Sequence, residues 1–240
     1  MKTRLDRTLV ERGLVESREK AQALIMAGEV RVDGRKASKS GQPVDPGASI
    51  EVLARPPYVG RGGFKLAAAL RQFAIGVEGA RCLDIGSSTG GFTDALLQAG
   101  AARVHAVDVG AGQLAWGLRT DPRVVLHERI NARQLTLAEI GERVELAVCD
   151  VSFISVTLIL PAVAPLLQPG GQMVILVKPQ FEVGKGQVGK GGIVRDPELH
   201  RAACGRVVGA VAELGFETGI MESPILGAEG NKEFLLHAHH

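Results

Sequence analysis

Four charged residues, far apart in the sequence, each lie at the border of an apolar segment: Lys65, Asp150, Lys178 and Glu233. Two amines and two carboxylates are suited to proton transfer. A lysine whose pKa is lowered by burial or by a second cation can remove the proton of a weakly acidic hydroxyl, and carboxylates can hold the ammonium groups in place. Taken singly, each of the four is more often a surface charge. The hypothesis of a reactive site therefore depends on the elements that bring them together.

The sequence beyond residue 60 alternates between strand and helix patterns, which is typical of a parallel sheet covered by helices on both faces. The last two strands are joined by a connection too short for a crossover helix, so we expect them to run antiparallel. The predicted fold class is α/β, a doubly wound, mostly parallel sheet with an antiparallel last strand, the class I methyltransferase variant. The expected helices are 61–73, 91–99, 155–167 and 196–213, and the expected strands are 81–85, 103–108, 124–127, 145–150, 172–178, 216–222 and 233–238.

This topology predicts that the four charged residues meet at one edge of the sheet. Asp150 and Lys178 end neighbouring strands at the carboxyl edge, where open α/β sheets bind ligands. Glu233 begins an antiparallel strand, which starts at the edge where its parallel neighbours stop. Lys65 lies near the start of a helix that must begin at this edge in order to deliver the chain to the opposite one.

A glycine-rich turn at 86–93 joins the strand at 81–85 to a helix, so a ligand can approach the backbone and the free N–H groups of the helix start. Asp108 ends the next strand, about 20 residues on, where a carboxylate can bind ribose hydroxyls. A dinucleotide site would need G-x-G-x-x-G and would place a pyrophosphate beside Asp84, which repels it, whereas the ammonium of S-adenosylmethionine suits Asp84. Asn131 is equally well explained as a turn former. The predicted S-adenosylmethionine contacts are Asp84, Gly86, Ser88, Thr89, Gly90, Gly91, Phe92, Asp108 and Asn131.

The first 54 residues predict a separate small α+β unit made of a helix, a second helix and a hairpin. Ser17 can cap the second helix, Gly28 can end it, and Asp33-Gly34 can form the hairpin turn. Residues 1–40 hold ten Lys/Arg against six Asp/Glu, so this unit is the expected polyanion contact, although solvated basic helix faces would give the same count. We expect the following contacts, most of them on or near one short surface: Arg4, Arg18, Lys20, Arg31, Arg35, Lys36 and Lys39.

Two prolines after Arg55 end this unit, which predicts domains at 1–54 and 61–240 joined by a linker at 55–60. Further along, residues 184–190 satisfy the pattern G-x-x-x-x-G-K of a phosphate-binding loop. Gly191 stands where that loop needs Ser or Thr, and no helix follows at once, so we exclude an NTPase. We interpret this segment as a mobile loop in which Lys185, Lys190 and Arg195 close over the polyanion.

Cysteines and histidines give no sign of a metal site. Cys82, Cys149 and Cys204 lie inside apolar patterns and are predicted to be buried structural thiols. The histidines at 237, 239 and 240 are expected to belong to a frayed end. No membrane segment or signal-peptide core is visible, and we expect a cytoplasmic protein.

Residues 4–52, RLDRTLVERGLVESREKAQALIMAGEVRVDGRKASKSGQPVDPGASIEV, resemble an S4 RNA-binding domain. That resemblance implies a small fold that docks on the shape and phosphates of folded RNA, although a unit of this size could also serve dimerisation. The Lys65, Asp150, Lys178, Glu233 set resembles the K-D-K-E tetrad of FtsJ-type RNA 2′-O-methyltransferases. In that family the second lysine, here Lys178, is taken as the base.

Five further segments resemble the TlyA family, which joins an S4 domain to an FtsJ-like methyltransferase. They are YVGRGGFKL at 58–66, LDIGSSTGGFTD at 83–94, CDVSFIS at 149–155, VKPQFE at 177–182 and GNKEFLLH at 230–237. The resemblance implies methylation of cytidine 2′-hydroxyls in ribosomal RNA at the subunit interface. Because little precedes the S4 segment or follows the last strand, we expect the shorter kind, which acts on large-subunit RNA.

Three alternatives remain open. A non-catalytic ribosome-assembly factor could keep the fold, but the intact tetrad argues against it. A membrane-lytic protein would fit the haemolysin label of the family, but no strongly basic amphipathic helix is visible. Methylation at cytosine C5 needs a thiol beside the target, and strand alternation turns Cys149 away from the predicted site. Ribosomal RNA or a ribosomal subunit is the expected partner, and no protein partner is evident.

Overall fold

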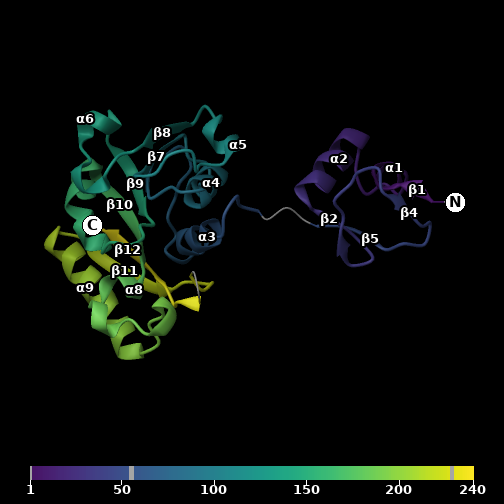
Figure 1. Cartoon of the computed structure of the whole chain (residues 1–240). Helices are drawn as coiled ribbons and strands as arrows, with labels where there is room; N and C mark the ends of the chain where they lie inside the picture. Colours follow the sequence, from purple (N-terminus) through teal and green to yellow (C-terminus); the bar gives the residue numbers. More distant parts are fainter. Residues whose placement is uncertain (1, 54–56, 228–229) are drawn as a thin grey trace. The chain divides into compact units, whose positions relative to one another are not determined.

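The computed structural model describes residues 2–53, 57–227 and 230–240, without the side chain of Lys185 (Figure 1). The chain divides into two compact units, Met1–Pro57 and Tyr58–His240. The predicted linker at 55–60 begins among residues outside this description. Each unit has its own hydrophobic core, so each is described by itself.

The first unit packs two helices against short strands, as the sequence predicts. The hydroxyl of Ser17 caps α2 by accepting a hydrogen bond from the backbone N–H of Lys20 at 3.2 Å, and Gly28 ends α2 with a φ of 75°. The sheet has the order β3-β2-β5, and β1 pairs with β4. Leu5 and Ile25 are fully or almost fully buried between the helices and the strands. The elements are β1 (Thr3–Arg4), α1 (Leu5–Glu11), α2 (Arg18–Ala27), β2 (Val30–Val32), β3 (Arg35–Lys36), β4 (Pro43–Val44) and β5 (Ile50–Val52).

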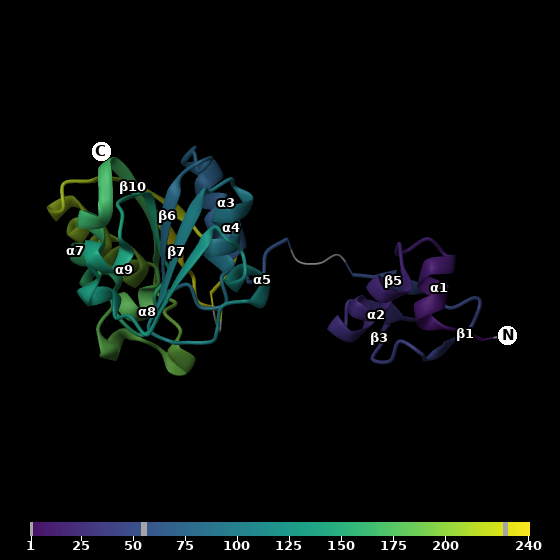
Figure 2. The same ribbon diagram turned by 90° about the horizontal axis from the view of Figure 1, so that it is seen from above.

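The second unit is a seven-stranded sheet with the order β11-β12-β10-β9-β6-β7-β8. Helices α3 and α4 cover one face of the sheet, and α7 and α9 cover the other, which Figure 2 shows from above. The strands are β6 (Arg81–Ile85), β7 (Arg103–Asp108), β8 (Val124–Glu128), β9 (Val144–Cys149), β10 (Leu167–Val177), β11 (Glu217–Glu222) and β12 (Phe234–His239). The α-helices are α3 (Gly62–Gln72), α4 (Gly91–Gln98), α5 (Trp116–Arg119), α6 (Leu137–Ile140), α7 (Leu160–Val163), α8 (Pro179–Glu182) and α9 (Pro197–Glu213).

The last strand enters the sheet between two others. β12 pairs antiparallel with both β10 and β11, while β6, β7, β8, β9 and β10 pair in parallel. The predicted antiparallel last strand is therefore confirmed. As expected for this arrangement, Glu233 immediately precedes β12 at the edge where β9 and β10 end.

The predicted helix at 155–167 is wrong as a continuous element. The structure has a 3-10 turn at Val156–Leu158, α7, and a second 3-10 turn at Ala164–Leu166. Pro161 and Pro165 lack the backbone N–H that a continuous helix needs at these positions, so the segment breaks into single turns. β10 also begins five residues earlier than the expected strand at 172–178, with an irregular register between Leu167 and Gln172.

The C-terminal histidines are not a frayed end. His237 and His239 belong to β12, and the imidazole Nε2 of His237 lies 2.7 Å from Oε1 of Gln172. The ring of His240 lies 4.3 Å from the ring of Phe216. Strand pairing and aromatic contacts thus fix this segment. Among the described residues, none of the helices has the length and apolar character of a membrane span.

Candidate active site

The glycine-rich turn after β6 brings three backbone segments together. Gly86 has a φ of 84°, and a Cβ there would lie 2.3 Å from the carbonyl oxygen of Asp150, so only glycine fits. Gly91 opens α4, and a Cβ on it would lie 3.1 Å from the backbone nitrogen of Gly63 at the start of α3. The helix that carries Lys65 therefore packs directly against the glycine-rich turn.

A cavity of about 530 Å³ lies over the carboxyl ends of β6, β7, β8 and β9. The carboxylate of Asp108 accepts hydrogen bonds from the backbone N–H of Ser88 at 2.8 Å and of Gly110 at 2.7 Å, which fixes it at the cavity wall. Asn131 lines the same cavity while its side chain caps a 3-10 turn by accepting from the backbone N–H of Arg133. The turn-forming role of Asn131 is therefore observed, and its contact with the cofactor stays a prediction. Of the predicted cofactor residues, this cavity gathers Gly86, Ser88, Asp108 and Asn131.

A second, smaller cavity of about 110 Å³ lies beside the turn and is bordered by Asp150 and Arg61. From the predicted cofactor set it gathers Gly86, Ser88, Thr89, Gly91 and Phe92. Two predicted residues line neither cavity. Gly90 lies under Leu114 and Leu118, and Asp84 is fully buried.

Asp84 is a buried carboxylate with one oxygen still available. Its Oδ2 accepts a 2.6 Å hydrogen bond from Thr93, while Oδ1 has no hydrogen-bond partner among the described residues. Burial raises the pKa of Asp84 to about 7, and the nearby carboxylate of Asp150 acts in the same direction. A buried orphan oxygen of this kind suits a cationic ligand group, which would satisfy it and favour its ionised form.

The four charged residues form two ion pairs. Nζ of Lys65 lies 2.5 Å from Oε2 of Glu233, and Nζ of Lys178 lies 2.6 Å from Oδ1 of Asp150. Lys178 also donates to the hydroxyl of Ser152 at 2.8 Å. Lys65 and Glu233 are 7% and 2% exposed, so the first pair is shielded from water. The side chains of all four residues therefore lie near one another, as the sequence predicts.

A third cavity, of about 430 Å³, is lined by Lys65, Lys178 and Glu233. Ser152 and Phe153 line this cavity and also the 530 Å³ cavity, so the loop after Asp150 separates the two spaces. The geometry therefore places two lysine amines and two carboxylates across one short loop from the 530 Å³ cavity.

Sequence reasoning missed Phe153, which stands out in three ways. Its φ of 69° is in the left-handed region, its side chain is 89% exposed, and its ring lies 5.5 Å from the ring of Phe181. A bulky residue seldom adopts this backbone conformation, so such strain marks a candidate functional position. The available signal was the CDVSFIS segment, which the resemblance contained without assigning a role to its aromatic residue.

Two buried polar residues that the sequence analysis did not single out hold the loops around the third cavity. Glu182 is 2% exposed and accepts from the hydroxyl of Ser155 at 2.5 Å and from the backbone N–H of Val156 at 2.8 Å. It ties α8 to the loop that carries Phe153. Asn231 accepts from the backbone N–H of Val194 and donates to the carbonyl of Gly192, so it pins one end of the glycine-rich segment at 184–195.

The predicted polyanion contacts form separate groups in the first unit. The guanidinium groups of Arg4 and Arg18 both bind Asp6. Arg31 and Lys36 are partners across β2 and β3, and their side chains are exposed. Three more predicted contacts, Arg35, Lys39 and Lys190, are also exposed.

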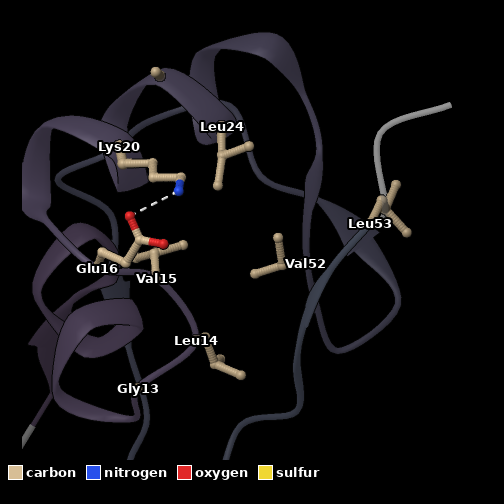
Figure 3. A pocket seen from close by; sticks show the side chains of 9 residues that line it. Gly13, Leu14, Val15, Glu16, Lys20, Leu24, Val52 and Leu53 are labelled. Carbon is tan, nitrogen blue, oxygen red and sulfur yellow. Dashed lines mark hydrogen bonds and ion pairs between the residues drawn. The ribbon is translucent and has the colours of Figure 1, made fainter. Parts of the chain in front are cut away.

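Lys20 has other neighbours than Arg18, and the expectation of one short surface stays a prediction. A groove of about 680 Å³ is lined by Leu14, Leu24 and Val52, and Figure 3 shows Lys20 at its rim, paired with Glu16 at 2.9 Å. Residues two apart on a helix do not share a face, so Arg18 turns to Asp6 while Lys20 turns to this groove. The charge of Lys20 is thus balanced by a neighbouring exposed carboxylate, that of Glu16.

The cysteines are buried or half-buried, as predicted, and none forms a disulfide. Cys149 packs inside the core, and burial raises the pKa of its thiol. It lines none of the three cavities of the second unit described above, so it is poorly placed for nucleophilic attack on a base. Among the described residues, no group of three or more His, Cys, Asp or Glu side chains could hold a metal ion.

A seven-stranded sheet with an antiparallel β12, and with cavities over its carboxyl edge, defines the class I S-adenosylmethionine-dependent methyltransferase fold. A solved methyltransferase of this class from Mesorhizobium loti has the same fold at 18% identity, with a TM-score of 0.54 over 72% of this chain and 96% of that chain. The model of the FtsJ-like methyltransferases matches residues 58–240, and the S4 domain model matches residues 3–50. The chain belongs to the FtsJ-like methyltransferase family, and within it to the TlyA group that carries an S4 domain.

Close relatives cover almost the whole chain. The 16S/23S rRNA (cytidine-2′-O)-methyltransferase TlyA of Mycobacterium tuberculosis is 51% identical over 238 residues, which is 98% of this chain and 89% of the relative. YqxC of Bacillus subtilis, described as a candidate rRNA methyltransferase, is 51% identical over 99% of this chain and 86% of its own length. A solved structure from Streptococcus thermophilus, described as a candidate hemolysin, is 44% identical with a TM-score of 0.76, covering 99% of this chain and 88% of that chain.

Proposed function

We propose that the chain transfers a methyl group from S-adenosylmethionine to the 2′-hydroxyl of a cytidine ribose in ribosomal RNA. We propose 23S rRNA, the large-subunit RNA, as the substrate. The observation that carries this proposal is the pair of ion pairs, Lys65 with Glu233 and Lys178 with Asp150, at a cavity that shares Phe153 with the larger cavity beside it. The name of the M. tuberculosis relative supports the choice of cytidine and ribosomal RNA. Such a substrate implies work in the cytoplasm.

The residues around the glycine-rich turn fit S-adenosylmethionine. When bound, this cofactor supplies an electrophilic methyl group on a positively charged sulfur. Oδ1 of Asp84, which lacks a partner among the described residues, would bind its ammonium group. Asp108 would bind the ribose hydroxyls, and Asn131 would border the adenine. The remaining contacts would come from Gly86, Ser88, Thr89, Gly90, Gly91 and Phe92.

Lys178 would act as the general base. Its Nζ, as the neutral amine, would take the proton from the 2′-hydroxyl while the oxygen forms a bond to the methyl carbon and the bond from that carbon to sulfur breaks. Asp150 and Ser152 hold Nζ in place, at 2.6 and 2.8 Å. Lys65, held by Glu233, places a second lysine amine at the same cavity.

RNA binding would fall mainly to the first unit, at 1–54, through basic side chains. We assign Arg4, Arg18, Arg31, Arg35, Lys36 and Lys39 to phosphate contacts, with Lys20 as a weaker contact because Glu16 balances it. In the catalytic unit, Lys185 and Lys190 of the glycine-rich segment would add contacts beside the target nucleotide.

Ribose methylation mapped in ribosomal RNA from cells with and without the gene tests this function. We expect one cytidine of 23S rRNA to lose its 2′-O-methyl group without the gene, and plasmid-borne wild-type protein to restore it. Lys178→Arg should not restore it, whereas Lys232→Arg, next to the site but paired with Glu222, should. Additional loss in 16S rRNA would widen the substrate range. No change in any ribose methylation would favour a non-catalytic assembly factor instead.

A further inference from the structure

We propose that Asp6 is a positioning residue for RNA, whose buried carboxylate holds the guanidinium groups of Arg4 and Arg18 together so that both donate to one phosphodiester of the RNA backbone. This inference rests on the proposed function and deepens its RNA-binding part. A carboxylate in the basic unit would ordinarily repel RNA. Its burial and its hydrogen bonds give it a different role.

The carboxylate of Asp6 accepts five hydrogen bonds from described residues of the first unit. It is 0% exposed and receives two hydrogen bonds from Arg4, to Oδ1 at 3.1 Å and to Oδ2 at 2.9 Å. Arg18 and Gln22 also donate to Oδ2, at 3.2 and 3.0 Å, and the backbone N–H of Arg7 donates to Oδ1 at 2.9 Å. The hydrogen bond from Arg4 is the largest cause that lowers the pKa of Asp6 far below its usual range. The carboxylate is therefore ionised throughout the physiological range.

The same contacts fix where the two guanidinium groups lie. Both Nη2 atoms bind one oxygen, Oδ2, so Arg4 and Arg18 must lie side by side although they are 14 positions apart. Arg4 also lies over the backbone of Gly41, where a Cβ would come within 3.0 Å of its Nη1 atom. Two long, flexible side chains are thus ordered before RNA arrives, which reduces the entropy that binding must remove.

Donors remain for a ligand on both arginines. Arg4 uses Nε and one hydrogen of Nη2, and Arg18 uses one hydrogen of Nη2, within the part of the chain that the structure describes. Each side chain is 54% exposed. The unused N–H groups of two adjacent guanidinium groups match the oxygens of a phosphate, which favours bidentate arginine contacts.

The sign of one substitution separates positioning from simple charge. Asp6→Asn removes a negative charge beside two arginines, so electrostatics alone predicts tighter RNA binding. The amide would place an N–H group against the arginine donors, so loss of positioning predicts weaker binding instead. Asp45→Asn is the matched control, because Asp45 is an exposed carboxylate of the same unit, paired only with Lys2 at 3.2 Å in the described structure.

The experiment measures binding of the full chain to an unmodified 23S rRNA transcript over a range of salt concentrations. We expect Asp6→Asn to weaken binding on the order of tenfold and to reduce the salt slope by roughly one phosphate contact. Asp45→Asn should leave affinity equal or slightly higher. Affinity that is unchanged or increased in Asp6→Asn would overturn the proposal.

A second background separates positioning from damage to the fold. In Arg4→Ala/Arg18→Ala protein, Asp6→Asn should cause no further loss, because the groups through which it acts are gone. A loss of the same size in that background would mean that Asp6 serves only the fold, and the proposal would be wrong. If the wild-type chain does not bind the transcript at all, the proposed function fails, and this inference fails with it.

Discussion

The amine of Lys178 contacts Asp150 and Ser152, and the proposed reaction requires it to accept a proton. Oδ1 of Asp150 lies 2.6 Å from its Nζ, and Lys65 lines the same cavity. Because Glu233 already pairs with Lys65, the charge of the second lysine is partly balanced in the resting structure. Which form of Lys178 prevails during transfer therefore decides whether it is a base or only an electrostatic contact.

Replacing Lys178 with arginine distinguishes these roles. A guanidinium keeps its charge and its ion pair with Asp150 but cannot accept a proton near neutral pH. We expect Lys178→Arg to lower the single-turnover rate by roughly 10²–10⁴-fold, the range typical of a general base, with S-adenosylmethionine binding nearly unchanged. Quenched-flow methyl transfer measures the rate, and Lys232→Arg is the control. A near wild-type rate in Lys178→Arg would leave only an electrostatic role.

Asp84 predicts that cofactor binding depends on pH. With its pKa raised to about 7 by burial, Asp84 is mostly protonated at pH 6, whereas an ammonium ligand needs the carboxylate. Binding should therefore weaken by roughly tenfold from pH 7.5 to pH 6, and near pH 7 it should release a proton. Calorimetry in buffers of different ionisation enthalpy measures both effects. Equal affinity at the two pH values without proton release would contradict the contact.

The matched variant Asp84→Asn also reports on stability without cofactor. The folded pKa of Asp84 lies above its unfolded value, so this carboxyl group lowers the stability of the fold progressively as the pH rises from about 4 to 7. At pH 8 we expect Asn to stabilise the chain on the order of 1–3 kcal/mol, because it removes a buried charge with an unpartnered oxygen. The gain should shrink toward pH 5 in thermal unfolding experiments.

Among the elements, the loop between β9 and the turn at Val156–Leu158 contributes residues to both the 530 Å³ and the 430 Å³ cavity. Its Ser152 accepts a hydrogen bond from Lys178, and its Phe153 lines both of these cavities of the second unit. Glu182 holds the far end of the loop through Ser155. The exposed ring of Phe153 beside Phe181 offers a face on which a nucleobase can stack. The loop would thus hold the target nucleotide, while β10 and α8 position Lys178, the proposed general base, which lies between them.

Relieving the backbone strain at Phe153 should make the fold more stable and the protein less active. Phe153→Gly removes a bulky side chain from a φ of 69°, so we expect the free energy of unfolding to rise by about 1 kcal/mol. RNA methylation should fall at least tenfold, because the stacking surface is lost. Chemical denaturation and methyl-transfer assays measure the two effects.

Ala74→Gly is the control for this strain, because Ala74 has a φ of 53° and lines none of the cavities described above. It should raise stability to a similar extent while leaving methylation unchanged. If Phe153→Gly keeps full activity, the ring has no part in binding RNA.

The sequence predicted the strands of the sheet, the antiparallel β12 and the meeting of Lys65, Asp150, Lys178 and Glu233, because hydrophobic periodicity and sheet topology determine where strands end. It did not predict the contacts made by connecting segments. The turns that replace the helix at 155–167 depend on prolines within an apolar run. The loop that carries Phe153 is held at Ser155 by Glu182, a contact between residues 27 positions apart that no local pattern indicates.

The contacts of the basic residues in the first unit could not be predicted from the sequence either. Composition indicated a polyanion contact, but charge counts carry no directions. Arg18 and Lys20 are two residues apart on α2 and turn to Asp6 and Glu16 respectively. Only the packing of α1 against α2 makes Asp6 a buried partner for two arginines, and no spacing in the sequence predicted that.

At the scale of the whole molecule, the two units have separate cores and separate chemistry. We expect a fragment beginning at Tyr58 to bind S-adenosylmethionine with near wild-type affinity, because the two cavities proposed for the cofactor are built entirely from residues beyond 58. Its affinity for 23S rRNA should fall at least tenfold, and the salt dependence of binding should become shallower, because most phosphate contacts are removed. Calorimetry and salt-dependent RNA binding measure the two changes.

The control for this fragment is full-length protein in which Arg31 and Lys36 are replaced by alanine. Their side chains are exposed, so the substitutions should reduce RNA affinity and leave cofactor affinity unchanged. Wild-type RNA affinity in the fragment would assign RNA recognition to the catalytic unit instead.

The place of β12 has a consequence for synthesis of the protein. The contact between Lys65 and Glu233 joins residues 168 positions apart, and the strand that follows Glu233 must enter between β10 and β11. A nascent chain therefore cannot assemble the site while its last strand is still inside the ribosome that makes it. The site therefore forms only once β12 has left the ribosome, so an enzyme whose proposed substrate is ribosomal RNA has no active form before that point of its own synthesis.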